Sequence, residues 1–141
     1  MTRSASPGVE RGIGGAGVLP ASTATLRLEG IPIPPSTNSL YANNKGKGRG
    51  RFKTQRYLTW QRAAGNAIEA QETTPIHGDV DVSIVVPRDD RRDVDNYAKA
   101  ALDLLVSHGL IDDDRFIISL HISKLTHAND RKHCTVTVRP A

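Results

Sequence analysis

The sequence predicts an α/β (α+β) fold in which two helices pack on a mixed sheet of about four strands. Several segments alternate apolar and polar residues, as half-buried strands do, and two others repeat apolar residues at helical spacing. The two kinds of segment are interleaved along the chain. Its 141 residues are enough for one domain core but not for two.

The N-terminal region differs in composition from the rest of the chain. Residues 1–24 are rich in Ser, Gly, Pro and Ala without a sustained apolar period, so we expect a flexible tail before one domain over 25–141. A G-x-G-x-x-G match lies at 12–17, but no strand pattern precedes it and Pro20 follows closely. We therefore expect no organic cofactor.

The first half of the domain is predicted to contain a strand, a loop and a helix. Leucines alternate with charged residues over 25–31, which predicts a short strand ended by the prolines that follow. Residues 36–53 are polar, Gly-rich and basic, and are predicted to form a long loop. Thr54 is expected to cap a helix that Thr73-Thr74-Pro75 ends. The apolar residues at helical spacing in it are Tyr57, Trp60, Ala64, Ala67 and Ile68.

The second half is predicted to contain one helix and three strands. Residues 80–86 alternate apolar and polar, which predicts a strand that Pro87 closes. A helix is expected over 93–108, and Gly109 stands where a helix C-terminal glycine belongs. Its predicted buried stripe consists of Val94, Ala98, Ala101, Leu102 and Leu105. The next strand is expected to carry Phe116, Ile118, Leu120 and Ile122 on one face, and the last one Cys134, Val136 and Val138.

Charge is segregated along the chain, whose formal net charge is +4. Between Ile31 and Ile68 there is no acidic residue, whereas ten aspartates stand from Asp79 to Asp114. Basic side chains bind a phosphate backbone, while carboxylates repel it unless they hold a metal ion. The combination indicates a metal-dependent enzyme that acts on the phosphates of a polyanion. The basic residues of the first stretch are Lys45, Lys47, Arg49, Arg51, Lys53, Arg56 and Arg62.

The acidic stretch contains two groups of candidate metal ligands. Asp93 and Asp95 stand at the expected start of the second helix, where both side chains can converge because the residue before a helix is still extended. The triplet Asp112-Asp113-Asp114 follows the end of that helix. Carboxylate oxygens without His or Cys nearby in sequence favour Mg²⁺ or Mn²⁺ over zinc.

Lys99 and Asn96 complete this candidate site. Asp95, Lys99 and Asp103 are four residues apart and share one helical face, so the lysine charge could stabilise a pentacovalent phosphate near the metal ligands. Asn96 could orient a ligand or a water molecule. Each feature alone also has a structural explanation: a helix N-cap, a solvated ion pair and a polar turn.

The combination is far more specific than its parts. The central run is Arg91-Arg92-Asp93-Val94-Asp95-Asn96-Tyr97-Ala98-Lys99-Ala100, followed by Asp103, Gly109 and Asp113-Asp114. Pro34-Pro35-Ser36-Thr37-Asn38, Tyr41 and the basic loop precede it. With the predicted strand order, these residues resemble the RusA-type family of Holliday junction resolvases over about 26–138.

The resemblance implies a RusA-like, homodimeric, Mg²⁺-dependent endonuclease, with Mn²⁺ as an alternative metal. Such an enzyme makes paired nicks across four-way branched DNA during recombination and repair, in the cytoplasm and encoded by a bacterium or a phage. Asp93, Asp95 and Asp114 are its implied catalytic carboxylates and metal ligands, and Lys99 its catalytic cation. Asp112 and Asp113 stay open as substitutes for Asp114. The expected DNA-binding residues are Lys45, Lys47, Arg49, Arg51, Lys53, Arg56, Arg92 and Asn96.

Chain geometry raises a question about the third carboxylate. A helix over 93–108 is about 22–24 Å long, and the five residues that follow span at most about 16–18 Å. Either the helix ends early, or Asp114 joins the site of another subunit. We favour the second arrangement, because an enzyme that makes two nicks needs two coupled sites and twofold dimers are common.

Two other functions are compatible with parts of the sequence. A non-catalytic DNA-binding module would use the basic loop alone, with the aspartates as solvated surface residues. A small-nucleotide metal phosphohydrolase would use the aspartates, although the basic loop is larger than one triphosphate needs. No stretch approaches the roughly 20 apolar residues of a membrane-spanning helix, so we expect no membrane association.

Overall fold

The computed structural model describes residues 24–43, 50–87, 93–125 and 132–141. The expected N-terminal tail falls almost entirely outside the described residues. So do four members of the expected DNA-binding set, which are Lys45, Lys47, Arg49 and Arg92.

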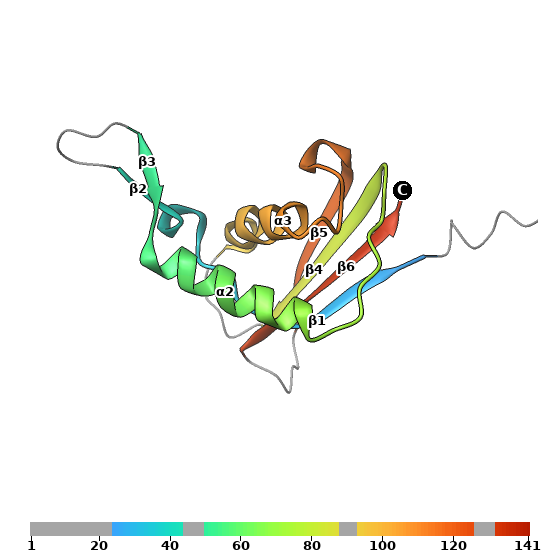
Figure 1. The fold of residues 1–141 in the computed structure, drawn as a ribbon, viewed down its shortest axis with the longest axis horizontal. Coiled ribbons are helices and arrows are strands. Elements are labelled where there is room, and N and C mark those ends of the chain that lie inside the picture. Colours follow the sequence, from blue (N-terminus) through green and yellow to red (C-terminus); the bar gives the residue numbers. More distant parts are fainter. Residues whose placement is uncertain (1–23, 44–49, 88–92, 126–131) are drawn as a thin grey trace, which may run out of the picture.

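A four-stranded mixed sheet forms the centre of the molecule (Figure 1). Its strands are β1 (Leu26–Pro32), β4 (Val80–Pro87), β5 (Ile117–Leu125) and β6 (His133–Pro140), in the order β1-β6-β4-β5. Strand β6 pairs antiparallel with β1 and β4, whereas β4 and β5 are parallel. The parallel pair is joined through a helix, as parallel neighbours require.

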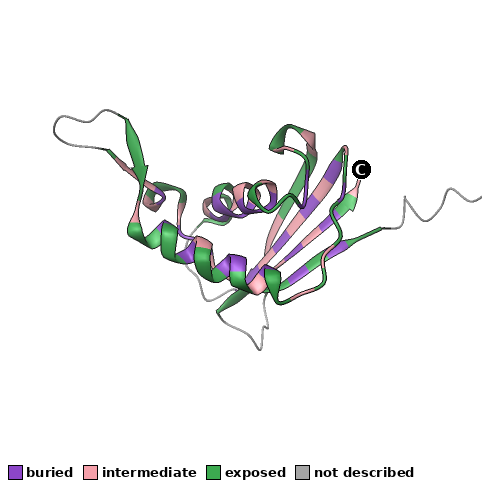
Figure 2. Cartoon of the chain, viewed as in Figure 1, coloured by how far each residue is buried: buried purple, intermediate pink, exposed green. Residues whose placement is uncertain are grey.

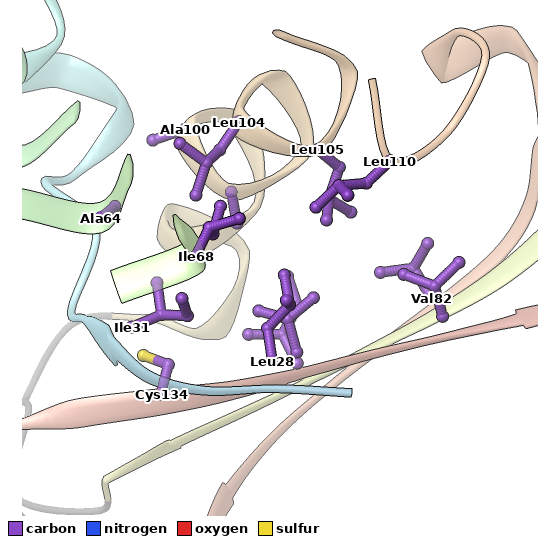
Figure 3. Close-up of a cluster of buried hydrophobic side chains, with 14 of the residues drawn as sticks. Leu28, Ile31, Ala64, Ile68, Val82, Ala100, Leu104, Leu105, Leu110 and Cys134 are labelled. Carbon is purple, nitrogen blue, oxygen red and sulfur yellow. The ribbon is translucent and has the colours of Figure 1, made fainter. Parts of the chain in front are cut away.

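Two helices, α2 (Gln55–Glu69) and α3 (Ala98–Ser107), lie over the sheet and confirm the predicted mixed α+β architecture (Figure 1). The buried side chains of both helices point toward those of the strands (Figure 3). On β4, every second residue from Val80 to Val86 is at most 1% exposed, as the alternation predicted (Figure 2). Tyr57 and Trp60 belong to this core, and the Trp60 indole Nε1 donates to the Pro32 carbonyl at 2.8 Å.

Both helices have well-defined ends. The Thr54 hydroxyl accepts from the Tyr57 backbone N–H at 3.2 Å, as expected of an N-cap, and donates to the Ser39 carbonyl at 2.6 Å. Helix α2 ends at Glu69, a few residues before the predicted Thr-Thr-Pro stop. Helix α3 ends at Ser107 with His108 as its C-cap, and Gly109 follows with a φ of 69°. This conformation confirms the predicted C-terminal glycine, since only glycine adopts that region freely.

The prediction of a continuous loop over 36–53 is wrong. A 3₁₀ turn (Thr37–Ser39) leads into β2 (Tyr41–Asn43), which pairs antiparallel with β3 (Arg51–Lys53). Strands of three residues are too short to show an alternating pattern. We call this hairpin the arm, and it extends away from the sheet and the helices (Figure 1).

The second helix also begins differently from the prediction over 93–108. Asp93 has an extended backbone, with φ −65° and ψ 149°, and the four residues Val94–Tyr97 form a 3₁₀ turn before α3 starts. The turn places the Tyr97 side chain in the core, where it is fully buried. The α-helix is therefore shorter than predicted, because the first turn is wound more tightly.

The expected apolar face of the third predicted strand is interrupted. Phe116 belongs to a 3₁₀ turn (Asp114–Phe116), and β5 starts at Ile117. Val80 pairs with Ile117 and Asp81 with Ser119, so Ile118 is an extra residue in the ladder and its side chain is 61% exposed. The bulge is the physical reason why the four predicted residues do not share one face. Among the described helices, none is long and apolar enough to cross a membrane.

We expect Thr54→Ala to lower the free energy of unfolding by about 1 kcal/mol, because α2 loses its capping oxygen. Chemical denaturation should show a lower midpoint with an unchanged slope, and the thermal midpoint should fall by about 4 °C. Thr59→Ala, at an exposed position inside the same helix, is the control. Equal effects of the two substitutions would contradict a capping role.

Candidate active site

The chain leaving α3 is fastened to the segment that precedes β4. Ile76 and Ile111 form a parallel β-bridge, and the Ile76 N–H donates to the Leu110 carbonyl at 2.9 Å. One carboxylate oxygen of Asp112 lies 2.8 Å from His77 Nδ1, and the other accepts from the Gly78 N–H at 2.8 Å. We call these contacts the clamp.

Asp112 is the side chain that closes the clamp. The hydrogen bond from His77, followed by that from the Gly78 N–H, holds the pKa of the Asp112 carboxyl below its ordinary value. Both of its oxygens already have protein partners. Of the three consecutive aspartates, Asp112 is thus the one whose carboxylate positions the chain.

The two following aspartates lie in a cavity of about 270 Å³ between α2, α3 and the base of the arm. Residues from four separate segments line it, and we call it the acidic cavity. Its lining residues are Tyr41, Lys53, Tyr57, Gln61, Asp103, Val106, Ser107, Asp113 and Asp114. The basic arm and the acidic triplet, which are some 60 residues apart in sequence, therefore meet at one place.

Asp113 and Asp114 interact directly. The hydrogen bond shared by the two carboxyl groups, together with the negative charge of Asp113, raises the pKa of Asp114 above its ordinary value. The same hydrogen bond lowers the pKa of Asp113. Two adjacent carboxyls that resist simultaneous ionisation form a site that a positive charge stabilises.

Lys99 supplies one such charge. Its Nζ lies 3.4 Å from an Asp103 carboxylate oxygen, and its charge opposes the rise in the pKa of Asp114. The structure thus brings Lys99, Asp103 and Asp114 together along one side of α3. Asp103 was placed on this helical face by its spacing but was not among the predicted catalytic residues.

Tyr57, which the sequence predicted as a core residue, also lines this cavity. Burial raises the pKa of its phenol to about 12, and the negative charge of Asp103 contributes. The phenol is therefore protonated at neutral pH. Its helical spacing indicated only a buried side chain, so the role of Tyr57 in the cavity wall could not be found from the sequence.

Asp93 and Asp95 stand at the other end of α3. Asp93 precedes the 3₁₀ turn without a side-chain capping bond, and both residues are exposed. Asn96 lies in the same turn, where its N–H donates to the Asp93 carbonyl at 3.0 Å. Over 24–43, 50–87, 93–125 and 132–141, no three His, Cys, Asp or Glu residues are arranged to hold a metal ion. Within these described residues, Asp93, Asp95 and Asp114 do not form such a group.

Arg51 and Lys53, two described basic residues of the predicted DNA-binding set, lie beside the acidic cavity, whereas Arg56 lines a separate pocket with Pro35 and Trp60. The Arg51 guanidinium carbon lies 4.6 Å from the centre of the Tyr41 ring, and Lys53 Nζ lies 5.5 Å from that of Tyr57. Arg56 is exposed on the first turn of α2. These contacts with ring faces restrict the cations and favour an ordered cationic surface.

A mixed α+β domain that sets a basic arm against a group of carboxylates and a lysine is typical of a nuclease. The chain belongs to the family described as endodeoxyribonuclease RusA, whose family model matches residues 32–139. This membership confirms the resemblance drawn from the sequence.

Two relatives are each named crossover junction endodeoxyribonuclease RusA. The one from Aquifex aeolicus (strain VF5) is 28% identical over 108 residues, which cover 70% of this chain and 78% of the relative. The one from Escherichia coli O139:H28 (strain E24377A / ETEC) is 30% identical over 97 residues, which cover 67% and 79% respectively.

We expect Asp112→Ala to lower the thermal midpoint of unfolding, because the clamp loses the bonds to His77 and Gly78. Asp79→Ala, which removes the same charge from an exposed position nearby, should have a smaller effect. In a double-mutant cycle, His77→Ala should add less in the Asp112→Ala background than in the unmodified chain. Additive effects would show that the two side chains do not stabilise each other.

Proposed function

We propose that this chain is a structure-selective DNA endonuclease that resolves Holliday junctions during recombination and repair. It would hydrolyse phosphodiesters in pairs across four-way branched DNA. The observation that carries the proposal is the acidic cavity, where the base of the basic arm faces Asp114 near Lys99. Both named relatives are crossover junction endodeoxyribonucleases, which supports the choice of branched DNA as substrate.

In this proposal, Asp93, Asp95 and Asp114 hold Mg²⁺, or Mn²⁺ as an alternative. Their carboxylates are the hard oxygen ligands that these cations prefer. A bound cation of this kind lowers the pKa of a water molecule and neutralises charge on a phosphate. Lys99 would stabilise negative charge on the scissile phosphate, and Asn96 would orient the DNA or the attacking water. No organic cofactor is required.

The basic residues would position the DNA. Arg51 and Lys53 present their charges on the arm, and Arg56 presents its charge on the first turn of α2. Lys45, Lys47, Arg49 and Arg92, which lie outside the described residues, would also bind DNA. Such contacts with phosphates fix the orientation of a nucleic acid rather than read its sequence. The enzyme would be encoded by a bacterium or a phage and would act in the cytoplasm.

We also propose that the enzyme is a homodimer whose two active sites are shared between subunits. Asp93 and Asp95 precede α3, whereas Asp114 lines the acidic cavity together with residues from the second half of that helix. Within the described residues of one copy, the three carboxylates do not form a group that could hold a metal ion. A second copy could supply the missing ligand at each site.

The outer edge of the sheet is a suitable contact surface for the second copy. Among the described strands, β5 pairs only with β4, so its other edge has no strand partner there. Ile118 and Leu120 on this strand are 61% and 39% exposed, and Val94, in the turn beside β5, is 44% exposed. A dimer interface would remove these apolar side chains from water, which is favourable.

We expect the chain to cut a synthetic four-way junction into two nicked duplexes in the presence of Mg²⁺. Asp95→Asn should lower the cleavage rate on the order of 100-fold or more, because a metal ligand loses its charge. Asp79→Asn, the same change outside the site, should retain the rate. Denaturing gels of end-labelled junctions give both measurements.

The same assay separates the competing functions. A non-catalytic DNA-binding module would bind the junction equally well with a chelator present and leave it uncut. A small-nucleotide phosphohydrolase would hydrolyse a nucleoside triphosphate but not the junction. Either result would contradict the proposed endonuclease.

Shared sites make a specific prediction for mixed subunits. Asp93→Asn and Asp114→Asn chains should each be inactive alone, but their heterodimer would contain one site with both residues intact. With random pairing, about a quarter of the sites are restored, so junction nicking should reappear at about a quarter of the unmodified rate. Mixtures should be refolded together so that subunits exchange.

The expected product of that mixture is a single nick, since only one site of each heterodimer is intact. Mixing either variant with itself is the control. If the heterodimers form, as shown by mass spectrometry of differently tagged subunits, and still do not nick, each site lies within one chain.

A further inference from the structure

The arm presents two different faces. In the antiparallel pair, Tyr41 lies opposite Lys53, Ala42 opposite Phe52, and Asn43 opposite Arg51. Directly opposed residues share a face and successive residues alternate, so Arg51 and Lys53 lie on one face and Phe52 on the other. In the described strands of the arm, Arg51 and Lys53 are therefore separated from Phe52.

The cationic face is held by aromatic rings and by α2. Arg51 lies over the Tyr41 ring, while Lys53 lies over the Tyr57 ring and its Nζ donates to Gln61 Oε1 at 3.4 Å. The base of the arm is tied down as well, since the Thr54 N–H donates to the Leu40 carbonyl at 3.0 Å. The arm is thus oriented with respect to the acidic cavity.

The opposite face leaves a large ring in water. The Phe52 side chain is 51% exposed, and its cross-strand neighbour, Ala42, is too small to cover it. Figure 2 shows that strand β3 is exposed, away from the buried residues of the core. Removing a half-exposed aromatic ring from water lowers the free energy, so binding of another molecule over the ring is favourable.

Charge favours DNA over a second copy as that molecule. Phe52 stands between Arg51 and Lys53 in a stretch, 32–67, that contains no acidic residue. Two copies of so basic an arm repel each other, whereas the phosphates of DNA are attracted to it. The part of DNA that covers an aromatic ring is the flat face of a base.

The position of the arm indicates which bases these are. Lys53 lines the acidic cavity, and Phe52 is the adjacent residue, with a Cα about 3.8 Å away along the chain. Because the ring points to the face opposite Lys53, a base in contact with it lies across the thickness of the arm from the phosphate at the carboxylates, a few nucleotides along the DNA. Bases at a branch point are already partly unstacked, so inserting a ring there costs less than in a continuous duplex.

We propose that Phe52 is a wedge that stacks on an unstacked base at the crossover of branched DNA, and that this contact gives the enzyme its preference for a branch over plain duplex. The proposal rests on the endonuclease function proposed above. Arg51 and Lys53, on the opposite face of the arm, bind phosphates of the same DNA. The ring inserts only where neighbouring bases can separate. Because every base has a flat aromatic face, this stacking contact does not depend on the DNA sequence.

The test uses a four-way junction with 2-aminopurine at the crossover, whose fluorescence rises when the base is unstacked. To prevent cutting, all proteins carry Asp95→Asn. Binding of the chain with Phe52 should raise the fluorescence, whereas Phe52→Ala should abolish the rise and weaken junction binding about tenfold, with duplex binding unchanged. Phe52→Trp should retain both properties. Leu58→Ala, which trims another half-exposed apolar residue, is the matched control.

The outcomes separate this proposal from the endonuclease function. If the chain with Asp95 intact cuts junctions, but Phe52→Ala keeps the fluorescence rise and the junction preference, the wedge is wrong and the function stands. A shift of Phe52→Ala from dimer to monomer, measured by light scattering, would show that the ring contacts a second copy instead. If the chain with Asp95 intact neither prefers nor cuts junctions, the endonuclease function itself fails.

Discussion

Gly109 turns the chain out of α3 at a positive φ, and the candidate active site depends on the direction of that turn. The N–H groups of Gly109 and Leu110 donate to the carbonyls of Val106 and Leu105 at 3.0 and 2.9 Å, the pattern of a Schellman motif. Leu110 and Ile111 then enter the core, where they are 3% and 2% exposed. The clamp continues from these residues, so the polar aspartates that follow are directed by buried apolar side chains.

This constraint gives consecutive aspartates different chemical environments. Asp112 is occupied by its bonds to His77 and Gly78, whereas Asp113 and Asp114 face the acidic cavity. Asp114 has Lys99 and Asp103 as electrostatic neighbours, and its pKa is raised mainly by Asp113. A turn that is one residue longer or shorter would exchange the structural aspartate for one that faces the cavity.

The sequence was most informative where a pattern extended over several residues. The alternation on β4, the cap at Thr54 and the glycine at the end of α3 all predicted the observed structure, because each depends on local physical chemistry. The family was also identified from its spacing of aspartates, asparagine and lysine, which the family match confirms.

The features that could not be predicted depend on contacts between distant segments. The arm is built on three-residue strands whose cations rest on rings from another part of the chain, including Tyr57 of α2. The bulge at Ile118 arises from the register with β4. Asp103 lines the cavity because the chain after α3 turns back and brings Asp113 and Asp114 beside that helix. The spacing of residues within one helix does not predict such a contact.

The position of β6 has a consequence for how the protein folds. This strand follows the other strands in sequence, yet in the sheet it lies between β1 and β4. Until His133–Pro140 leaves the ribosome, β1 and the β4–β5 pair have no common partner, so their inner edges stay open. Pairings of such large sequence separation form slowly. During synthesis, the chain therefore passes through a state in which β1 and the β4–β5 pair are not yet joined by β6. The unpaired strand edges of that state favour association with other chains.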